Sequence, residues 1–152
     1  MKIETQFSVF LVNKPGVLSQ VCNQLANARI NITALSMMDS SEHGVLRLIS
    51  DNPARTRLAL KDLNLPTTET DVLSMELPNR PGALAEVCDR LTSAHVNVNY
   101  AYSTGNSVSA KGTRTTVILK VADLKKAQKV LAAPVPRRRG EATAIRRAVV
   151  KR

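Results

Sequence analysis

The first third of the chain shows both of the periods that distinguish strands from helices. Phe7, Val9 and Leu11 alternate with polar neighbours in the segment 5–12, which predicts a half-buried strand. Apolar side chains then recur every three or four residues, which predicts an amphipathic helix. The apolar positions of this helix are Leu18, Val21, Cys22, Leu25 and Ala28. The chain therefore opens with a strand followed by a helix.

The next elements complete the order strand, helix, strand, strand, helix, strand. The extended segments are 30–38, 45–50 and 67–77, and the turn between the first two is at 40–44. Pro53 suits the first position of a second helix, because a proline there loses no hydrogen bond. The predicted apolar side of that helix consists of Ala54, Leu58 and Leu63. The segment 67–77 must both end this unit and begin the next.

A second copy of the same unit begins 66 residues after the first. Nine of the 24 positions from Asn13 to Ser36 match Asn79 to Tyr102 without a gap. The matches are Asn13/Asn79, Pro15/Pro81, Gly16/Gly82, Leu18/Leu84, Val21/Val87, Cys22/Cys88, Leu25/Leu91, Ala28/Ala94 and Asn31/Asn97. The second copy has predicted helices at 81–94 and 123–131, and strands at 96–102 and 114–121, the latter after a Gly/Ser-rich turn. Two copies of one supersecondary unit explain the repeat.

This element order predicts an α+β protein of two ferredoxin-like βαββαβ units, with antiparallel sheets and the helices on one face. The expected domains are residues 1–70 and 71–133. A basic tail, 134–152, follows where a last strand is due. Two prolines and three arginines before Gly140 oppose a strand, and 141–150 fits either a helix or a poor strand. The tail is expected to be part of a last strand or disordered.

Composition and charge narrow the class of protein. The chain is 43% apolar and 22% charged, as expected for a globular domain with a core. It has no signal-peptide pattern and no apolar run long enough to cross a bilayer. Two cysteines at matching positions suggest a reducing, cytoplasmic location. Of the net charge of +10, the tail contributes +6, so nucleic-acid binding by the body is not expected.

A Pro-Gly pair precedes the first helix of each copy. Pro15 has a torsion suited to the first helical position, and Gly16 lets a ligand approach the backbone closely. The amides of Gly16, Val17 and Leu18 have no acceptor within the helix, so with the helix dipole they can hold a carboxylate or phosphate. The alternative interpretation is that each pair only starts a helix and that water satisfies the amides.

The repeated motif Asn-Lys/Arg-Pro-Gly-Xaa-Leu, with an asparagine at the start of each second strand, resembles tandem ACT domains. The chain is similar over residues 2–132 to free-standing bacterial proteins made of two such domains. The resemblance implies a regulatory module that binds free amino acids between the loop before the first helix and the second strand, often across a domain interface. The implied binding residues are Asn13, Lys14, Pro15, Gly16, Val17, Leu18, Asn31, Ile32, Asn79, Arg80, Pro81, Gly82, Ala83, Leu84, Asn97 and Val98.

No pattern of catalytic or metal-binding residues stands out, so we expect neither an enzyme nor a cofactor. Cys22 and Cys88 lie on the apolar side of their helices, which predicts buried packing. Tyr100 and Tyr102 are expected to share a strand face with Val98. Leu35 and Met37 are expected on the face opposite Ile32 and Ala34, which predicts a homodimer through the helix-free side of the sheet or through edge strands.

Two other functions fit the same elements. A regulatory subunit of an amino-acid biosynthetic enzyme, like the small subunit of acetolactate synthase, is also built from ACT domains and would need a partner enzyme. An RNA-binding ferredoxin-like module shares the element order but needs aromatic side chains on its central strands. The segments 45–50 and 114–121 have none. The sequence does not identify the amino acid.

Overall fold

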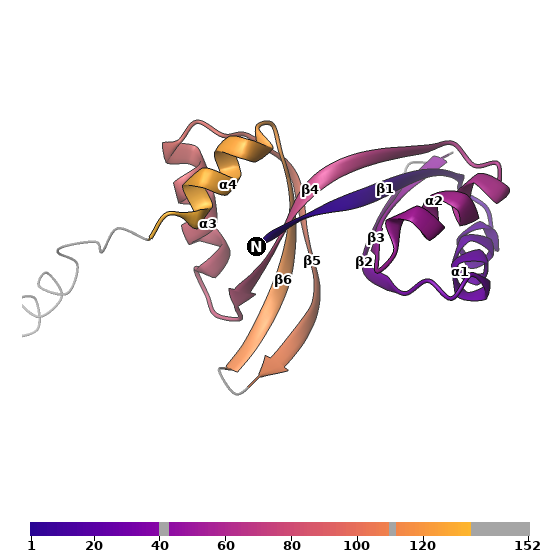
Figure 1. Ribbon diagram of the computed structural model, residues 1–152, viewed down its shortest axis with the longest axis horizontal. Helices are drawn as coiled ribbons and strands as arrows, with labels where there is room; N and C mark the ends of the chain where they lie inside the picture. The colour runs from indigo at the N-terminus through magenta and orange to yellow at the C-terminus, as the bar shows by residue number, and fades with distance from the viewer. Residues whose placement is uncertain (40–42, 110–111, 135–152) are drawn as a thin grey trace, which may run out of the picture.

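The chain folds into the predicted order of strands and helices. The computed structural model describes residues 1–39, 43–109 and 112–134 (Figure 1). The elements are β1 (Lys2–Val12), α1 (Val17–Asn27), β2 (Ile32–Asp39), β3 (His43–Ser50), α2 (Pro53–Asp62), β4 (Thr67–Pro78), α3 (Ala83–Ser93), β5 (Val98–Ser109), β6 (Gly112–Val121) and α4 (Leu124–Ala132). The predicted α+β class and the two βαββαβ-like units are confirmed.

All six strands of the described chain belong to one antiparallel sheet with the order β2-β3-β1-β4-β6-β5. The long strand β4 joins the two copies. Its first part pairs with β1, from Thr67 opposite Val9 to Ser74 opposite Lys2. Its second part pairs with β6, from Leu73 opposite Leu119 onward. A single strand therefore runs across the expected boundary at residues 70 and 71 and makes the two units continuous.

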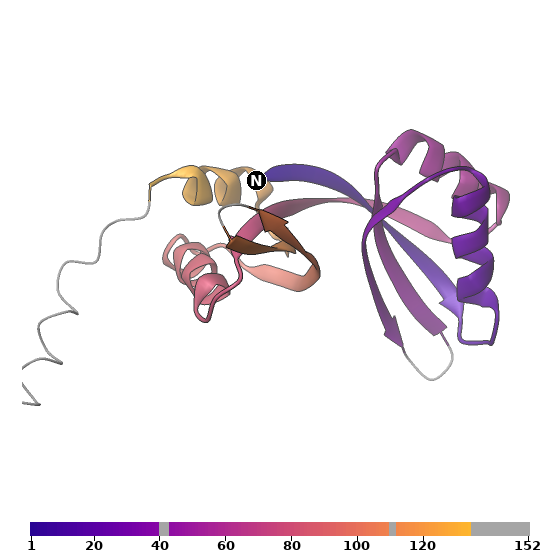
Figure 2. The same ribbon diagram turned by 90° about the horizontal axis from the view of Figure 1, so that it is seen from below.

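The four helices cover one face of this sheet in two separate pairs. Ile3 lies opposite Leu73, so the side chains of Phe7 and Leu73 are on the same face, since alternate residues of a strand share a face. Phe7 packs in the core beneath α1 and α2, and Leu73 packs in the core beneath α3 and α4. Figures 1 and 2 show the two helix pairs at opposite ends of the molecule, with the strands between them.

The helix-free face of the sheet curls inward, so that the two copies face each other across it. We call this contact the seam. Ala34, Ile49, Val72 and Ile118 are buried there as a small apolar cluster. The edge strands β2 and β5 also meet, since the hydroxyl of Thr104 donates to a backbone oxygen of β2 at 3.1 Å. Within one molecule, each repeat unit thus covers much of the helix-free face of the other.

A β-bulge near the start of β2 reverses the predicted faces of that strand. The register shifts between Ile32 and Ala34, so Ile32 packs toward the helices and Ala34 packs in the seam. Leu35 lies opposite Leu48, a residue of the helix-side core, and Met37 therefore also lies on the helix-bearing face. The expectation that Leu35 and Met37 mark the face opposite both Ile32 and Ala34 is wrong, because a bulge changes the two-residue period.

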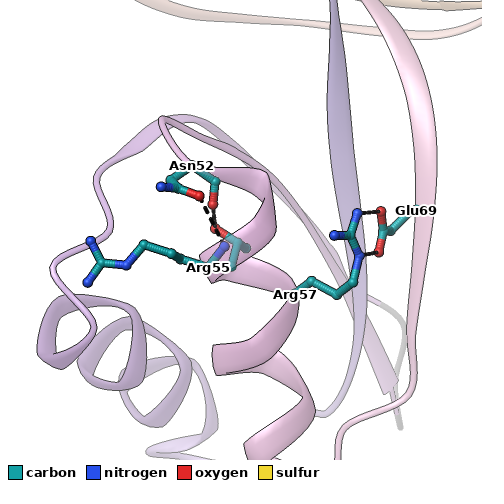
Figure 3. A network of polar contacts seen from close by, with 5 residues as sticks. Asn52, Arg55, Arg57 and Glu69 are labelled. Atoms are coloured by element: carbon teal, nitrogen blue, oxygen red, sulfur yellow. Dashed lines mark hydrogen bonds and ion pairs between the residues drawn. The ribbon is translucent and has the colours of Figure 1, made fainter.

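Figure 3 shows how α2 is fixed to the first copy. The Asn52 carboxamide oxygen accepts from the Arg55 amide at 3.1 Å and caps the helix, which begins at Pro53 as predicted. One turn later, the Arg57 guanidinium binds both carboxylate oxygens of Glu69 on β4 at 2.6 Å. The helix is therefore anchored both at its first turn and to the neighbouring strand.

Three smaller predictions about individual elements are corrected. Leu58 is 65% exposed and Ala54 is also exposed, because the buried side of α2 consists of Thr56, Ala59 and Leu60. Cys88 is exposed and Cys22 only half-buried, so neither thiol is a fully buried packing residue. The predicted Gly/Ser-rich turn is mostly strand, since β5 continues to Ser109.

Two predicted segments lie partly or wholly outside the described residues. The turn at 40–44 includes residues 40–42, and the tail includes residues 135–152. Within the described part of the chain, α4 is the last element, whereas in the first copy the second helix is followed by β4. The expectations for the tail stay predictions.

Candidate functional site

Both Pro-Gly turns adopt the same left-handed backbone conformation. Gly16 has φ +91° and Gly82 has φ +86°, and each is the N-cap of its helix without a side-chain cap. Residues with a Cβ rarely adopt this conformation, which explains the glycine in each copy. A Cβ placed on Gly16 would meet no heavy atom within 4 Å, so the space in front of this turn is open.

The first amides of α1 and α3 are free in the same pattern. In the first copy, the Val17 amide makes a long contact of 3.4 Å with the Lys14 carbonyl oxygen. The amides of Gly16, Leu18 and Ser19 have no acceptor among the described residues. In the second copy, the free amides are those of Gly82, Leu84 and Ala85, by the same criterion. Each turn therefore presents three donors at the positive end of a helix.

The two turns differ in the charge around these donors. The first turn of α1 has no acidic residue, whereas that of α3 has Glu86. The Arg80 guanidinium donates to the Glu86 carboxylate at 2.7 Å and to the Pro81 carbonyl oxygen at 3.3 Å. The residue of the first copy that matches Glu86 is Gln20, so Lys14 has no corresponding carboxylate. A bound anion would meet a competing carboxylate only in the second copy.

The strand positions implied by the resemblance have backbone roles in the structure. The Asn31 amide donates to the Asp51 carboxylate at 3.1 Å, and the Asp51 amide donates to the Asn31 carbonyl oxygen at 3.0 Å. In the second copy, the Asn97 carbonyl oxygen accepts from the Ala122 amide. The side chains of Ile32 and Val98 pack on the helix-side cores. Only the two asparagine side chains, which are exposed, are available to a ligand.

Within one copy, the turn and the second strand are not brought together. Val12, just before the first turn, lies opposite His43, whereas Ile32 lies opposite Ser50 at the other end of β3. Seven residues of strand separate these ends by roughly 23 Å. The same separation recurs in the second copy, where Pro78 lies opposite Arg114 and Val98 opposite Val121.

The seam contains a buried polar cluster that was not predicted from the sequence. Gln6 is fully buried, and its amide nitrogen donates to the hydroxyl of Tyr100 at 2.7 Å and of Ser8 at 3.3 Å. The hydroxyl of Tyr102 donates to the Gln6 oxygen at 3.0 Å. Burial, and secondarily the neighbouring Tyr100, raises the pKa of Tyr102 well above its usual range. Gln6 occupies a polar position of an alternating strand, so the sequence carried no sign of its burial.

A second bulge aims the tyrosines into this cluster. The register of β5 shifts between Val98 and Tyr100, so Val98 faces the helices and the tyrosines face the seam. The expectation that Tyr100 and Tyr102 share a face with Val98 is wrong. Arg47 of the first copy also lies over the Tyr100 ring, 4.2 Å from its centroid. The tyrosines therefore join the two copies.

The described residues meet the requirements of neither a metal site of three such ligands nor a membrane-spanning helix. Over residues 1–39, 43–109 and 112–134, no three His, Cys, Asp or Glu side chains form a group that could hold a metal ion. No helix in the same part of the chain is long and apolar enough to cross a membrane.

Comparison with known proteins decides the family. The family model described as "ACT domain pair" matches residues 1–134. The chain belongs to the ACT domain pair family. Its structure is similar to that of protein BT0572 from Bacteroides thetaiotaomicron, with 35% identity, a TM-score of 0.78, and coverage of 85% of this chain and 86% of that one. No curated protein sequence matches significantly.

More distant solved structures share the fold. The regulatory subunit of aspartate kinase from Thermus thermophilus, in a ligand-free form, has 12% identity and a TM-score of 0.60, with 86% of this chain and 95% of that one covered. The corresponding subunit from Thermus flavus has 14% identity and the same TM-score, with 86% and 92% covered. At these identities, the likeness concerns the arrangement of the two ACT units.

Proposed function

We propose that this ACT domain pair is a non-catalytic regulatory protein that binds free amino acids at its two Pro-Gly turns. The observation that carries the proposal is the match between the turns. Gly16 and Gly82 share a left-handed conformation, and each precedes two amides without acceptors. Such donors at a helix N-terminus suit the carboxylate that every free amino acid carries.

The charge around the turns supports unequal affinities. The turn at Gly16 has Lys14 and no acidic residue in its first helical turn. At Gly82, the Glu86 carboxylate already occupies the guanidinium of Arg80 and opposes a second negative charge near the helix N-terminus. The first-copy turn is therefore expected to bind the carboxylate more tightly.

The distance between turn and strand supports a site completed by a second chain. The exposed asparagines Asn31 and Asn97 lie at the far ends of their own copies from the turns. The helices α1 and α3 are at opposite ends of the molecule (Figures 1 and 2). An amino acid held by a turn and an asparagine would thus lie between two chains, which favours a homodimer in which each chain completes the partner's sites.

The same features bear on the other candidate functions. RNA-binding modules of this element order use the open sheet face to stack bases. Here that face forms the seam, where Gln6, Ile49 and Ile118 are buried, so RNA binding is not favoured. A regulated partner enzyme, as for the aspartate kinase subunits, fits the proposed role. We place the protein in the cytoplasm, in keeping with its two free cysteines.

A thermal-shift screen against the twenty free amino acids tests the proposal first. A ligand that binds only the folded state raises the melting temperature in proportion to the logarithm of its excess over Kd. We expect at least one amino acid to raise the melting temperature. Hydroxy acids of the same shape, which lack the ammonium group, show whether that group is needed. A melting temperature unchanged by all twenty at millimolar concentration would contradict the proposed function.

A further inference from the structure

The seam contains a cavity of about 700 Å³ that neither Pro-Gly turn reaches. Its floor is formed by Ser74 and Ile118 on the helix-free face of the sheet, and β2 of the first copy contributes Thr33 and Ala34. Thr104 and the neighbouring Gly105 of β5 line another side. Cavities that bind small ligands have volumes of roughly 300 to 1,000 Å³. Both copies thus border a half-open space of suitable size.

Two polar groups of the cavity lining have no hydrogen-bond partner among the described residues, and one of them, Arg114 Nε, is a fully buried atom. Ser74 is only 3% exposed, and no described residue hydrogen-bonds to its hydroxyl. The Nε atom of Arg114 is buried and makes no hydrogen bond within the described chain, although the Glu76 carboxylate forms an ion pair with it at 3.3 Å. Because buried polar atoms are almost always satisfied, Arg114 Nε is available to a ligand in this cavity, and the Ser74 hydroxyl is a second donor in the same lining.

The charges around the cavity restrict the chemistry of that partner. Lys2 is paired with Glu4, and Arg114 is paired with Glu76, so the four charged side chains of the lining balance one another. An ion with a net charge would leave one charge uncompensated in this partly buried space. A molecule with one positive and one negative group can interact with both pairs and leave the balance intact.

We propose that the seam cavity is a third binding site, which takes a small zwitterion of the free α-amino acid class. The ligand carboxylate accepts from Arg114 Nε and the Ser74 hydroxyl, and its ammonium group donates to Glu76 or Glu4. The proposal extends the proposed function, since it concerns the same class of ligand, but it uses no residue of the Pro-Gly turns. A ligand here contacts both copies and therefore stabilises their arrangement.

Gly105 belongs to the cavity lining and has room for a side chain. A Cβ built on Gly105 meets no heavy atom within 4 Å, and the residue has no left-handed backbone, so Gly105→Leu adds bulk without backbone strain. Ser103→Leu is the matched control, because Ser103 is exposed and lies one residue outside the cavity lining on the same strand. Ser74→Ala tests the hydroxyl without adding volume.

The test is calorimetric titration of the full chain with each of the twenty free L-amino acids. Wild type, Gly105→Leu, Ser103→Leu and the double variant Gly16→Asn/Gly82→Asn are compared. We expect Gly105→Leu to lose one site per chain, Ser103→Leu to lose none, and the double glycine variant to keep one site. Ser74→Ala should weaken that remaining site at least fivefold, which tests the proposal even if Gly105→Leu does not fold.

Equal numbers of sites in wild type, Gly105→Leu and Ser74→Ala, with equal affinities, would overturn the seam site. So would a double glycine variant, correctly folded, that binds none of the twenty amino acids. Failure of the turn sites looks different, because the double glycine variant would then bind as many molecules as wild type.

Discussion

The phenol of Tyr102 donates a hydrogen bond to the side-chain oxygen of Gln6, 3.0 Å away and 96 residues earlier in the chain. Tyr102 belongs to β5 of the second copy and Gln6 to β1 of the first, so this bond crosses the seam. Gln6 is fully buried, and a buried amide that loses a partner destabilises the fold.

Tyr102→Phe should therefore lower the free energy of unfolding by about 1 to 3 kcal/mol, the cost of an unsatisfied buried acceptor. Urea denaturation measures the change. Gln20→Leu, at an exposed position of α1, serves as the control and should alter stability by no more than about 0.5 kcal/mol. A Tyr102→Phe variant as stable as wild type would show that the bond contributes nothing to the contact of the copies.

The same burial should be visible in the titration of Tyr102. The chain has two tyrosines and no tryptophan, so in Tyr100→Phe the phenolate absorbance near 295 nm reports Tyr102 alone. Burial is the larger cause of the raised pKa and remains in this variant, so ionisation should begin well above pH 10. Since the pKa is higher in the folded state, the stabilisation is complete below pH ~10 and decreases as pH rises further. Ionisation near pH 10 in the folded protein would contradict this.

Acid should weaken the anchor between α2 and β4 (Figure 3). The hydrogen bonds from Arg57 hold the pKa of the Glu69 carboxyl below its usual range, and they raise the pKa of Arg57. A carboxyl with a lowered folded-state pKa stabilises the protein above its unfolded pKa, and this contribution disappears as pH falls through the folded pKa. Glu69→Gln should reduce the dependence of stability on pH below about pH 4.5, by a small amount because the pair is exposed. Urea denaturation from pH 3 to pH 7 gives the free energy of unfolding at each pH. If the pair has no effect, this free energy will change with pH equally in wild type and Glu69→Gln.

The sequence contained most of the fold because the repeat and the residue periods are local signals. The order of strands and helices and the extended segment 67–77 follow from such signals, and the structure confirms them. The bulges near Thr33 and Asn99 are different, since one extra residue changes the faces of the residues that follow it, up to the next register shift of the strand. No local pattern marks those bulges, so the faces of Leu35 and Tyr100 could not be predicted.

The candidate site could be predicted only in part, because local sequence signals do not show tertiary contacts. The left-handed turns at Gly16 and Gly82 follow from the Pro-Gly pairs, which were visible in the sequence. The seam cavity depends on how the curled sheet brings β2 and β5 together, a contact between residues 71 positions apart. Ser74 and Arg114 therefore looked like ordinary strand residues until the tertiary arrangement was known.

Single substitutions at the matching residues Gln20 and Glu86 should remove the difference between the turns. Gln20→Glu adds a negative charge near the first helix terminus and should weaken binding there by roughly two- to fivefold, whereas Glu86→Gln should strengthen binding at the second turn by a similar factor. Calorimetric titration at low salt measures both. Affinities that stay at their wild-type values at both turns in both variants would show that the helix termini do not hold the carboxylate.

The central claim is that the Pro-Gly turns bind the ligand, and the glycines test it most directly. Valine at either position would strain the left-handed backbone itself, so asparagine, which tolerates this conformation, is the better substitution. Its side chain enters the open space before the free amides. Calorimetric titration of wild type, Gly16→Asn and Gly82→Asn with an amino acid found in the thermal-shift screen should show one site fewer per chain in each variant, with the circular dichroism spectrum unchanged. Variants that keep the number of sites and the affinity of wild type would contradict the claim.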